Sequence, residues 1–143
     1  MNRRDALFAT GALLAAGAAS AATDHSHHHH EGAHPWQAVL DTAGICIEKG
    51  EVCLTHCIML MGEGDKTMAA CASSVREMLA SCRALITLAG AESKFAPKLA
   101  ALCVDVCKAC EAECKKHADK HKACKECMES CAECAKACKA KVA

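Results

Sequence analysis

Large apolar side chains are scarce in this chain of 143 residues, which has no Tyr, one Trp and two Phe. Leu, Ile, Val and Phe together make up about 16% of the sequence, too little for an ordinary hydrophobic core. An excess of charge is also missing, because 17 Lys and Arg balance 17 Asp and Glu. A nucleic-acid-binding protein needs basic residues in excess, and one that binds single strands also needs aromatic rings on which bases stack. These absences argue against nucleic acid as a partner.

Cysteine is abundant instead, with 14 residues in a chain whose length allows a single domain. Because the larger hydrophobic residues are so few, the interior of any folded domain must include these cysteines.

The first 22 residues have the pattern of an export signal. Arg3 and Arg4 precede an apolar run over residues 6–19, and the small residues Ala19-Ser20-Ala21 follow as a cleavage site. The apolar run is too short and too rich in alanine for a good membrane span. The paired arginines resemble the twin-arginine signal, although an ordinary signal can also contain them. We therefore expect a mature protein that is exported, periplasmic or otherwise extracytoplasmic, with no membrane span after cleavage.

Residues 23–34 form a polar segment that carries six of the nine histidines: His25, His27, His28, His29, His30 and His34. The segment has no periodic apolar residues and is predicted to be disordered. Histidine tracts bind Cu(II), Zn(II) or Ni(II) through neutral imidazoles. Cleavage after Ala22 would also create a Cu(II)-chelating terminus, Thr23-Asp24-His25. A solubilising tail or an engineered tag would have a similar composition.

Helical periodicity covers the rest of the chain, residues 35–143. Apolar or Cys residues recur every three or four positions over about residues 35–61, 65–89, 93–116 and 120–140. The short connections between these segments predict antiparallel neighbours. The expected fold is all-α, an up-down-up-down four-helix bundle.

The cysteines lie on one face of each expected helix. They are Cys46, Cys53 and Cys57 in the first, Cys71 and Cys82 in the second, Cys103, Cys107, Cys110 and Cys114 in the third, and Cys124, Cys127, Cys131, Cys134 and Cys138 in the fourth. In the third and fourth helices the steps alternate between three and four, as the a and d positions of a heptad do. The spacing therefore predicts a bundle whose core is lined by Cys. Aligning the helix ends places Cys57, Cys71, Cys114 and Cys124 in one layer, and Cys46, Cys82, Cys103 and Cys134 or Cys138 in a deeper one.

Several chemistries could use such a core. Disulfides are common in exported Cys-rich chains, but side chains on one helix face have poor geometry for bridging each other. Bridges between helices stay open. Zinc and iron–sulfur sites usually draw their ligands from loops, whereas Cys124, Cys127, Cys131 and Cys134 lie within one helix. A few buried cysteines can serve as small hydrophobic residues, but fourteen are too many.

Charge favours Cu(I) among the metals. Buried thiolates need neutralisation, and Cu(I) is a soft monovalent ion that prefers sulfur. If every thiolate bridges two ions and every ion joins two thiolates, the core is neutral at about 14 Cu(I) per chain. Zinc held by four thiolates would leave a double negative charge at each site. No acid–base pair or activated nucleophile is evident, so we expect no enzymatic activity. The alternatives are a disulfide-stapled structural protein, or a thiolate protein for Zn or Cd detoxification.

The signal, the His-rich segment and the Cys-lined helices together resemble the exported bacterial copper storage proteins. That resemblance implies a homotetramer that stores Cu(I) for copper enzymes such as particulate methane monooxygenase. It also implies His and Met ligands at one open end of the bundle. His56 and Met68 are the candidates for these ligands, while Met59, Met61, His117 and His121 lie close to the same end.

Overall fold

The computed structural model describes residues 34–142, which fold as four helices joined by short loops. The helices are α1 (Gln37–Gly62), α2 (Ala69–Gly90), α3 (Ala96–Lys115) and α4 (Lys122–Lys139). Their bounds lie close to the predicted ones. The predicted export signal and residues 23–33 of the His-rich segment lie outside the described residues.

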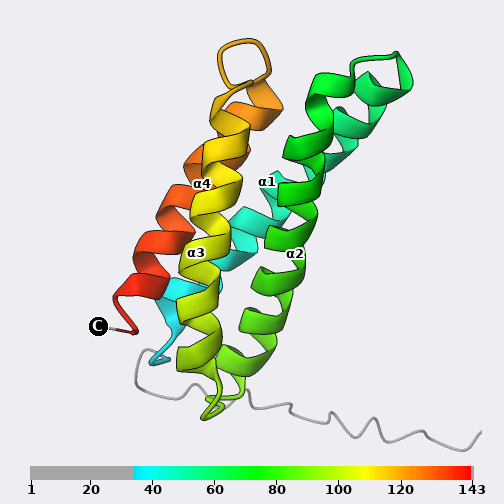
Figure 1. Cartoon of the computed structure of the whole chain (residues 1–143). Coiled ribbons are helices and arrows are strands. Elements are labelled where there is room, and N and C mark those ends of the chain that lie inside the picture. The colour runs from blue at the N-terminus through cyan, green and yellow to red at the C-terminus, as the bar shows by residue number, and fades with distance from the viewer. Residues whose placement is uncertain (1–33, 143) are drawn as a thin grey trace, which may run out of the picture. The chain divides into compact units, whose positions relative to one another are not determined.

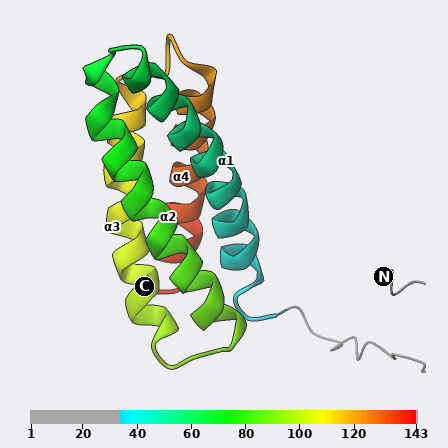
Figure 2. The same cartoon turned by 90° about the vertical axis from the view of Figure 1, so that its right-hand side faces the viewer.

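Each helix packs against two others, so that α1, α2, α3 and α4 close a ring in chain order. The α1–α2 and α3–α4 connections lie at one end of the bundle and the α2–α3 connection at the other (Figures 1 and 2). The predicted up-down-up-down four-helix bundle with a Cys-lined core is confirmed. Among the described residues, no helix is both long and apolar enough to cross a bilayer.

The turn between α1 and α2 uses local backbone chemistry. Gly64 has a φ of +100°, a conformation that glycine adopts without steric cost. Asp65 then accepts a hydrogen bond of 2.9 Å from the backbone N–H of Thr67 and caps a short 3-10 helix, η1 (Lys66–Met68), which leads into α2. Asp65 therefore caps this segment one 3-10 turn ahead of the α-helix.

The core changes in character along the bundle axis. Cysteines fill most of its length, whereas the end with the α2–α3 connection is filled by hydrocarbon. Five fully buried side chains make up this apolar end: Val39, Leu85, Ala89, Ala96 and Ala100. The sulfur-lined interior is thus closed by packed hydrocarbon at one end.

Candidate metal centre

All fourteen cysteines are free thiols, and each of them is fully buried. The alternation of steps of three and four turns every Cys of α3 and α4 toward the same side of its helix. Charged residues occupy the outer faces. Together these positions make one sulfur-lined interior to which all four helices contribute, as the spacing predicts.

Twelve of the cysteines fall into four groups, three of which share members, and within each group the sulfur atoms lie within 4.8 Å of one another. The groups are Cys46/Cys82/Cys107/Cys134, Cys53/Cys57/Cys71/Cys124, Cys53/Cys114/Cys127 and Cys110/Cys127/Cys131. Cys53 and Cys127 each belong to two groups and so connect neighbouring groups along the axis. Cys103 and Cys138 belong to none of them.

The sulfur-to-sulfur distances suit metal ions that bridge the helices. Cys46 lies 3.6 Å from Cys131, and Cys53 lies 3.8 Å from Cys124. A metal–sulfur bond is about 2.3 Å long, so two sulfurs on opposite sides of one ion are at most about 4.6 Å apart. Contacts of 3.6–4.0 Å between thiols therefore need only small side-chain adjustments to hold an ion. The residues present fit a soft, thiolate-binding metal.

One detail of the predicted layering is wrong. The group that contains Cys46, Cys82 and Cys134 is completed by Cys107, which lies 3.9 Å from Cys82, and not by Cys103. The difference is one helical turn of α3, since residues four apart share a face. The other predicted layer is closer to the structure: Cys57, Cys71 and Cys124 share a group, and Cys114 lies 3.6 Å from Cys71.

Hydrogen bonds between the thiols lower the pKa of some cysteines and raise that of others. The pKa of Cys134 is lowered to about 5, mainly by a hydrogen bond from Cys107, and that of Cys114 to about 6, mainly by one from Cys110. The hydrogen bond between Cys53 and Cys114 has opposite effects on its two members: it lowers the pKa of Cys114 and raises that of Cys53. Burial raises the pKa of Cys53 further. Hydrogen bonds within the core therefore lower the pKa of some thiols and raise that of others, and the thiolate is the form that binds metal.

Histidines meet at the end of the bundle where the α1–α2 and α3–α4 connections lie. His56 Nε2 of α1 is hydrogen-bonded to His121 Nδ1 at the start of α4 at 2.9 Å, and the rings of His117 and His121 are 6.4 Å apart. The carboxylate of Asp65 is nearby: hydrogen bonds from Thr67 lower its pKa, and the two α3–α4 histidines add to the shift. Soft and borderline ligands thus surround one end of the sulfur-lined interior.

The predicted ligands His56 and Met68 occupy different settings. His56 is partly buried among the histidines, whereas Met68 is fully buried in the core at the start of α2. Met59 points to solvent with 59% of its surface exposed, and Met61 is partly buried, so the two do not face inward together. His121, for which the sequence predicts no definite role, is the direct partner of His56.

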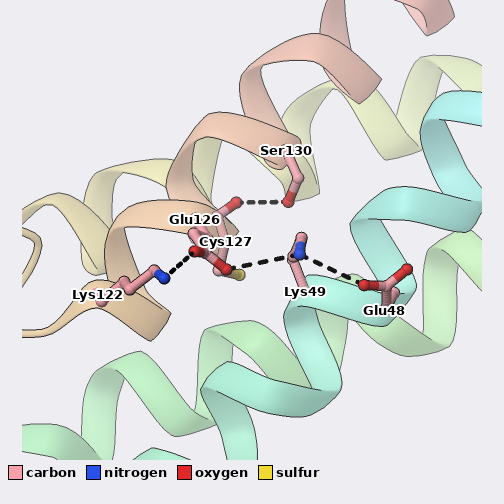
Figure 3. Close-up of polar contacts among 6 residues, drawn as sticks. All are labelled: Glu48, Lys49, Lys122, Glu126, Cys127 and Ser130. Atoms are coloured by element: carbon pink, nitrogen blue, oxygen red, sulfur yellow. Dashed lines mark hydrogen bonds and ion pairs between the residues drawn. The ribbon is translucent and has the colours of Figure 1, made fainter.

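Charged residues join α1 to α4 on the outside of the bundle. Lys49 lies between Glu48 at 3.3 Å and Glu126 at 3.5 Å, and Lys122 reaches the same Glu126 (Figure 3). On α4 itself, the hydroxyl of Ser130 donates to the backbone carbonyl of Cys127 at 2.9 Å (Figure 3). Such partly exposed pairs contribute little to stability. They show that the outer face of α4 is polar, while its sulfurs face inward.

Comparison with known proteins gives one family. The family model described as "Csp: Copper storage protein" matches residues 29–143. Among curated proteins, the "uncharacterized cysteine-rich protein YhjQ" of Bacillus subtilis (strain 168) is 29% identical over 107 residues, covering 75% of this chain and 95% of that protein. Among solved structures, apo-Csp3 (copper storage protein 3) from Bacillus subtilis superposes with a TM-score of 0.66 at 28% identity, covering 75% of this chain and 98% of the other.

Proposed function

Because this chain belongs to the copper storage protein family, we propose that its sulfur-lined interior holds about one Cu(I) per cysteine. The family and the cysteine groups inside the helical bundle make it a copper storage protein rather than an enzyme. The proposed ligands are all fourteen cysteines, together with His56 and Met68 at the histidine end.

The observation that carries the proposal is the continuity of the sulfur groups: three of them share members, and the contact of 3.6 Å between Cys46 and Cys131 joins the fourth to these three. Cys53 and Cys127 each belong to two groups, so a thiolate at either position can bridge two ions. If each thiolate bridges two ions and each ion contacts two thiolates, the core holds as many ions as thiolates. With a monovalent ion the positive and negative charges then cancel, and the buried core is neutral. A divalent ion at each four-sulfur group would instead leave negative charge in the interior, which is costly there.

Copper uptake is proposed at the histidine end. His56 and His121 lie beside the first cysteine layer there, whereas hydrocarbon side chains fill the opposite end. Imidazole and thioether groups bind copper more weakly than a set of bridging thiolates, so they can pass ions inward by ligand exchange.

The cellular setting is also part of the proposal. The arginine pair and apolar run at the N-terminus support export to the periplasm or another extracytoplasmic space. The resemblance to the exported copper storage proteins suggests a homotetramer and copper enzymes such as particulate methane monooxygenase as recipients.

An anaerobic Cu(I) titration of the reduced protein against a competing chelator tests the stoichiometry. Saturation near 12 to 15 ions per chain, the range set by the thiol count, is expected. Saturation at one to four ions would contradict a continuous store and indicate discrete sites. Tight binding of Zn(II) with weak binding of Cu(I) would favour the Zn or Cd alternative, and extensive oxidation to disulfides without loss of the fold would favour the disulfide-stapled one.

A further inference from the structure

One inward position of α1 carries no side chain. The buried ladder of this helix runs through Val39, Ala43, Cys46, Gly50, Cys53 and Cys57, in alternating steps of four and three. Gly50 thus lies between two inward-facing cysteines of the same helix, Cys46 and Cys53. A glycine in the middle of a helix costs about 1 kcal/mol relative to alanine, so its presence at a buried ladder position calls for a packing reason.

The side chain of Met78 from α2 fills the space at Gly50. A Cβ atom added at position 50 would lie only 2.5 Å from Met78 Cε and 2.9 Å from Leu79 Cδ2. Met78 is fully buried and belongs to the inward ladder of α2, one turn before Cys82. Even the smallest side chain at position 50 would therefore require Met78 to move.

The sulfur atom of Met78 is in contact with the cysteines. Met78 Sδ lies 3.4 Å from Cys46 Sγ, and Cys46 belongs to the group formed with Cys82, Cys107 and Cys134. Cys46 also lies 3.6 Å from Cys131. Methionine often fills irregular gaps in hydrocarbon cores, but here its thioether sulfur meets a thiol.

We propose that Met78 is a Cu(I) ligand that acts with Cys46, in a space that Gly50 keeps open. The inference rests on the proposed storage of Cu(I) and adds a ligand within the cysteine region, away from the histidine end. Thioethers, like thiolates, are soft ligands that suit Cu(I). A copper ion held by one thiolate and one thioether is neutral without a bridging thiolate, so the site at Met78 does not depend on a second, shared thiolate.

The proton balance of this site also differs. A thioether carries no proton, so an ion that binds between Cys46 and Met78 displaces at most one proton, whereas an ion between two thiols that it does not share with another ion displaces two. The thioether also disfavours a divalent ion, because it contributes no negative charge. Met78 is therefore a determinant of selectivity for soft monovalent ions.

Two substitutions and a matched control test the proposal by Cu(I) competition on the reduced full chain. Met78→Leu keeps volume and hydrophobicity but removes the sulfur. Gly50→Ala removes no sulfur atom from the chain but forces the end of the Met78 side chain out of the space beside position 50. Met128→Leu makes the same chemical change at a partly buried methionine on α4 that packs against the core. Circular dichroism and thermal unfolding of all variants establish that each is folded.

At chelator concentrations where the parent protein is just saturated, we expect Met78→Leu and Gly50→Ala each to retain about one Cu(I) fewer per chain. Met128→Leu should match the parent. A variant that combines Gly50→Ala with Met78→Leu should lose no more copper than Met78→Leu alone, because both changes remove the same ligand. Equal retention by Met78→Leu and the parent at every chelator concentration would overturn the proposal. Full retention by Gly50→Ala alone would overturn the role assigned to Gly50.

X-ray absorption at the selenium edge gives a readout that a purely structural role would not change. Protein grown with selenomethionine and loaded with Cu(I) should show direct selenium–copper scattering, and Met78→Leu should show less of it. An unchanged selenium–copper signal in Met78→Leu would contradict the proposal. If the parent binds no copper in the titration, the failure lies with the proposed storage function, and the assignment of Met78 falls with it.

Discussion

Cys53 offers the sharpest test of how the cysteine groups share copper. It is fully buried and is the one residue common to Cys53/Cys57/Cys71/Cys124 and Cys53/Cys114/Cys127. The replacement Cys53→Ala removes one thiolate of fourteen, so charge balance alone predicts a loss of about one ion. Because that thiolate completes two groups, the expected loss is about two ions, giving saturation near 12.

Cys138→Ala is the matched control, because Cys138 is equally buried but belongs to none of the four groups. Its expected loss is about one ion. Each substitution removes a single buried sulfur at a cost of about 1 kcal/mol, which lowers the melting temperature of a domain of this size by about 4–8 °C. Both variants should therefore remain folded at 25 °C, and the copper counts can be compared directly.

The assay is an anaerobic Cu(I) titration of the parent and the two variants side by side, with a chelator that reports free copper. Cys53→Ala saturating at the same number as Cys138→Ala would refute the reasoning from shared groups. Saturation of Cys53→Ala at the parent's number would refute the assignment of Cys53 as a ligand.

Further expectations concern pH, uptake and packing. Affinity for Cu(I) should fall as pH is lowered, because thiols with a raised pKa, such as Cys53, must release a proton; competition assays at pH 6 and 8 should differ about tenfold per pH unit for each proton displaced. An affinity independent of pH would contradict this. The copper-free protein should become more stable as pH rises from about 5 toward the ordinary thiol pKa, because the pKa of Cys134 is about 5 when folded and the unfolded chain then binds more protons; anaerobic urea unfolding that is constant over this range would count against it. His56→Ala should slow the loading of copper several-fold while removing at most about one ion, as stopped-flow mixing would show; an unchanged rate would place uptake elsewhere. Leu85→Ala should cost about 2–5 kcal/mol of unfolding free energy, because Leu85 is fully buried at the apolar end, and a loss below about 1 kcal/mol in urea unfolding would contradict tight packing there.

The helices and their inward faces could be predicted from the sequence because both depend on local periodicity. A step of three or four residues places a side chain on the same face whatever the helix packs against. The cysteines of α3 and α4 keep this step throughout, so their spacing is sufficient to place them on a shared face. The Asp65 cap is a similar local signal, since the side chain and the N–H that it accepts from are two residues apart.

The register between helices could not be predicted in the same way. Cys103 and Cys107 lie on the same face of α3, one turn apart, and only the packing of α3 against its neighbours decides which of them joins Cys46. Small differences in where each helix begins shift one helix against another by about 1.5 Å per residue, and sequence does not resolve them. The pairing of His56 with His121 depends on the same register.

The sequence by itself therefore determined the four-helix bundle, the inward orientation of all fourteen cysteines and the choice of a soft metal, because periodicity and charge are properties of the chain alone. Tertiary structure decided which sulfurs share a group. It also explained why a glycine stands at position 50, because the space beside it is filled by Met78 from another helix. Contacts between helices depend on the relative shift and rotation of whole elements, and a residue's own neighbours in the chain carry little of that information.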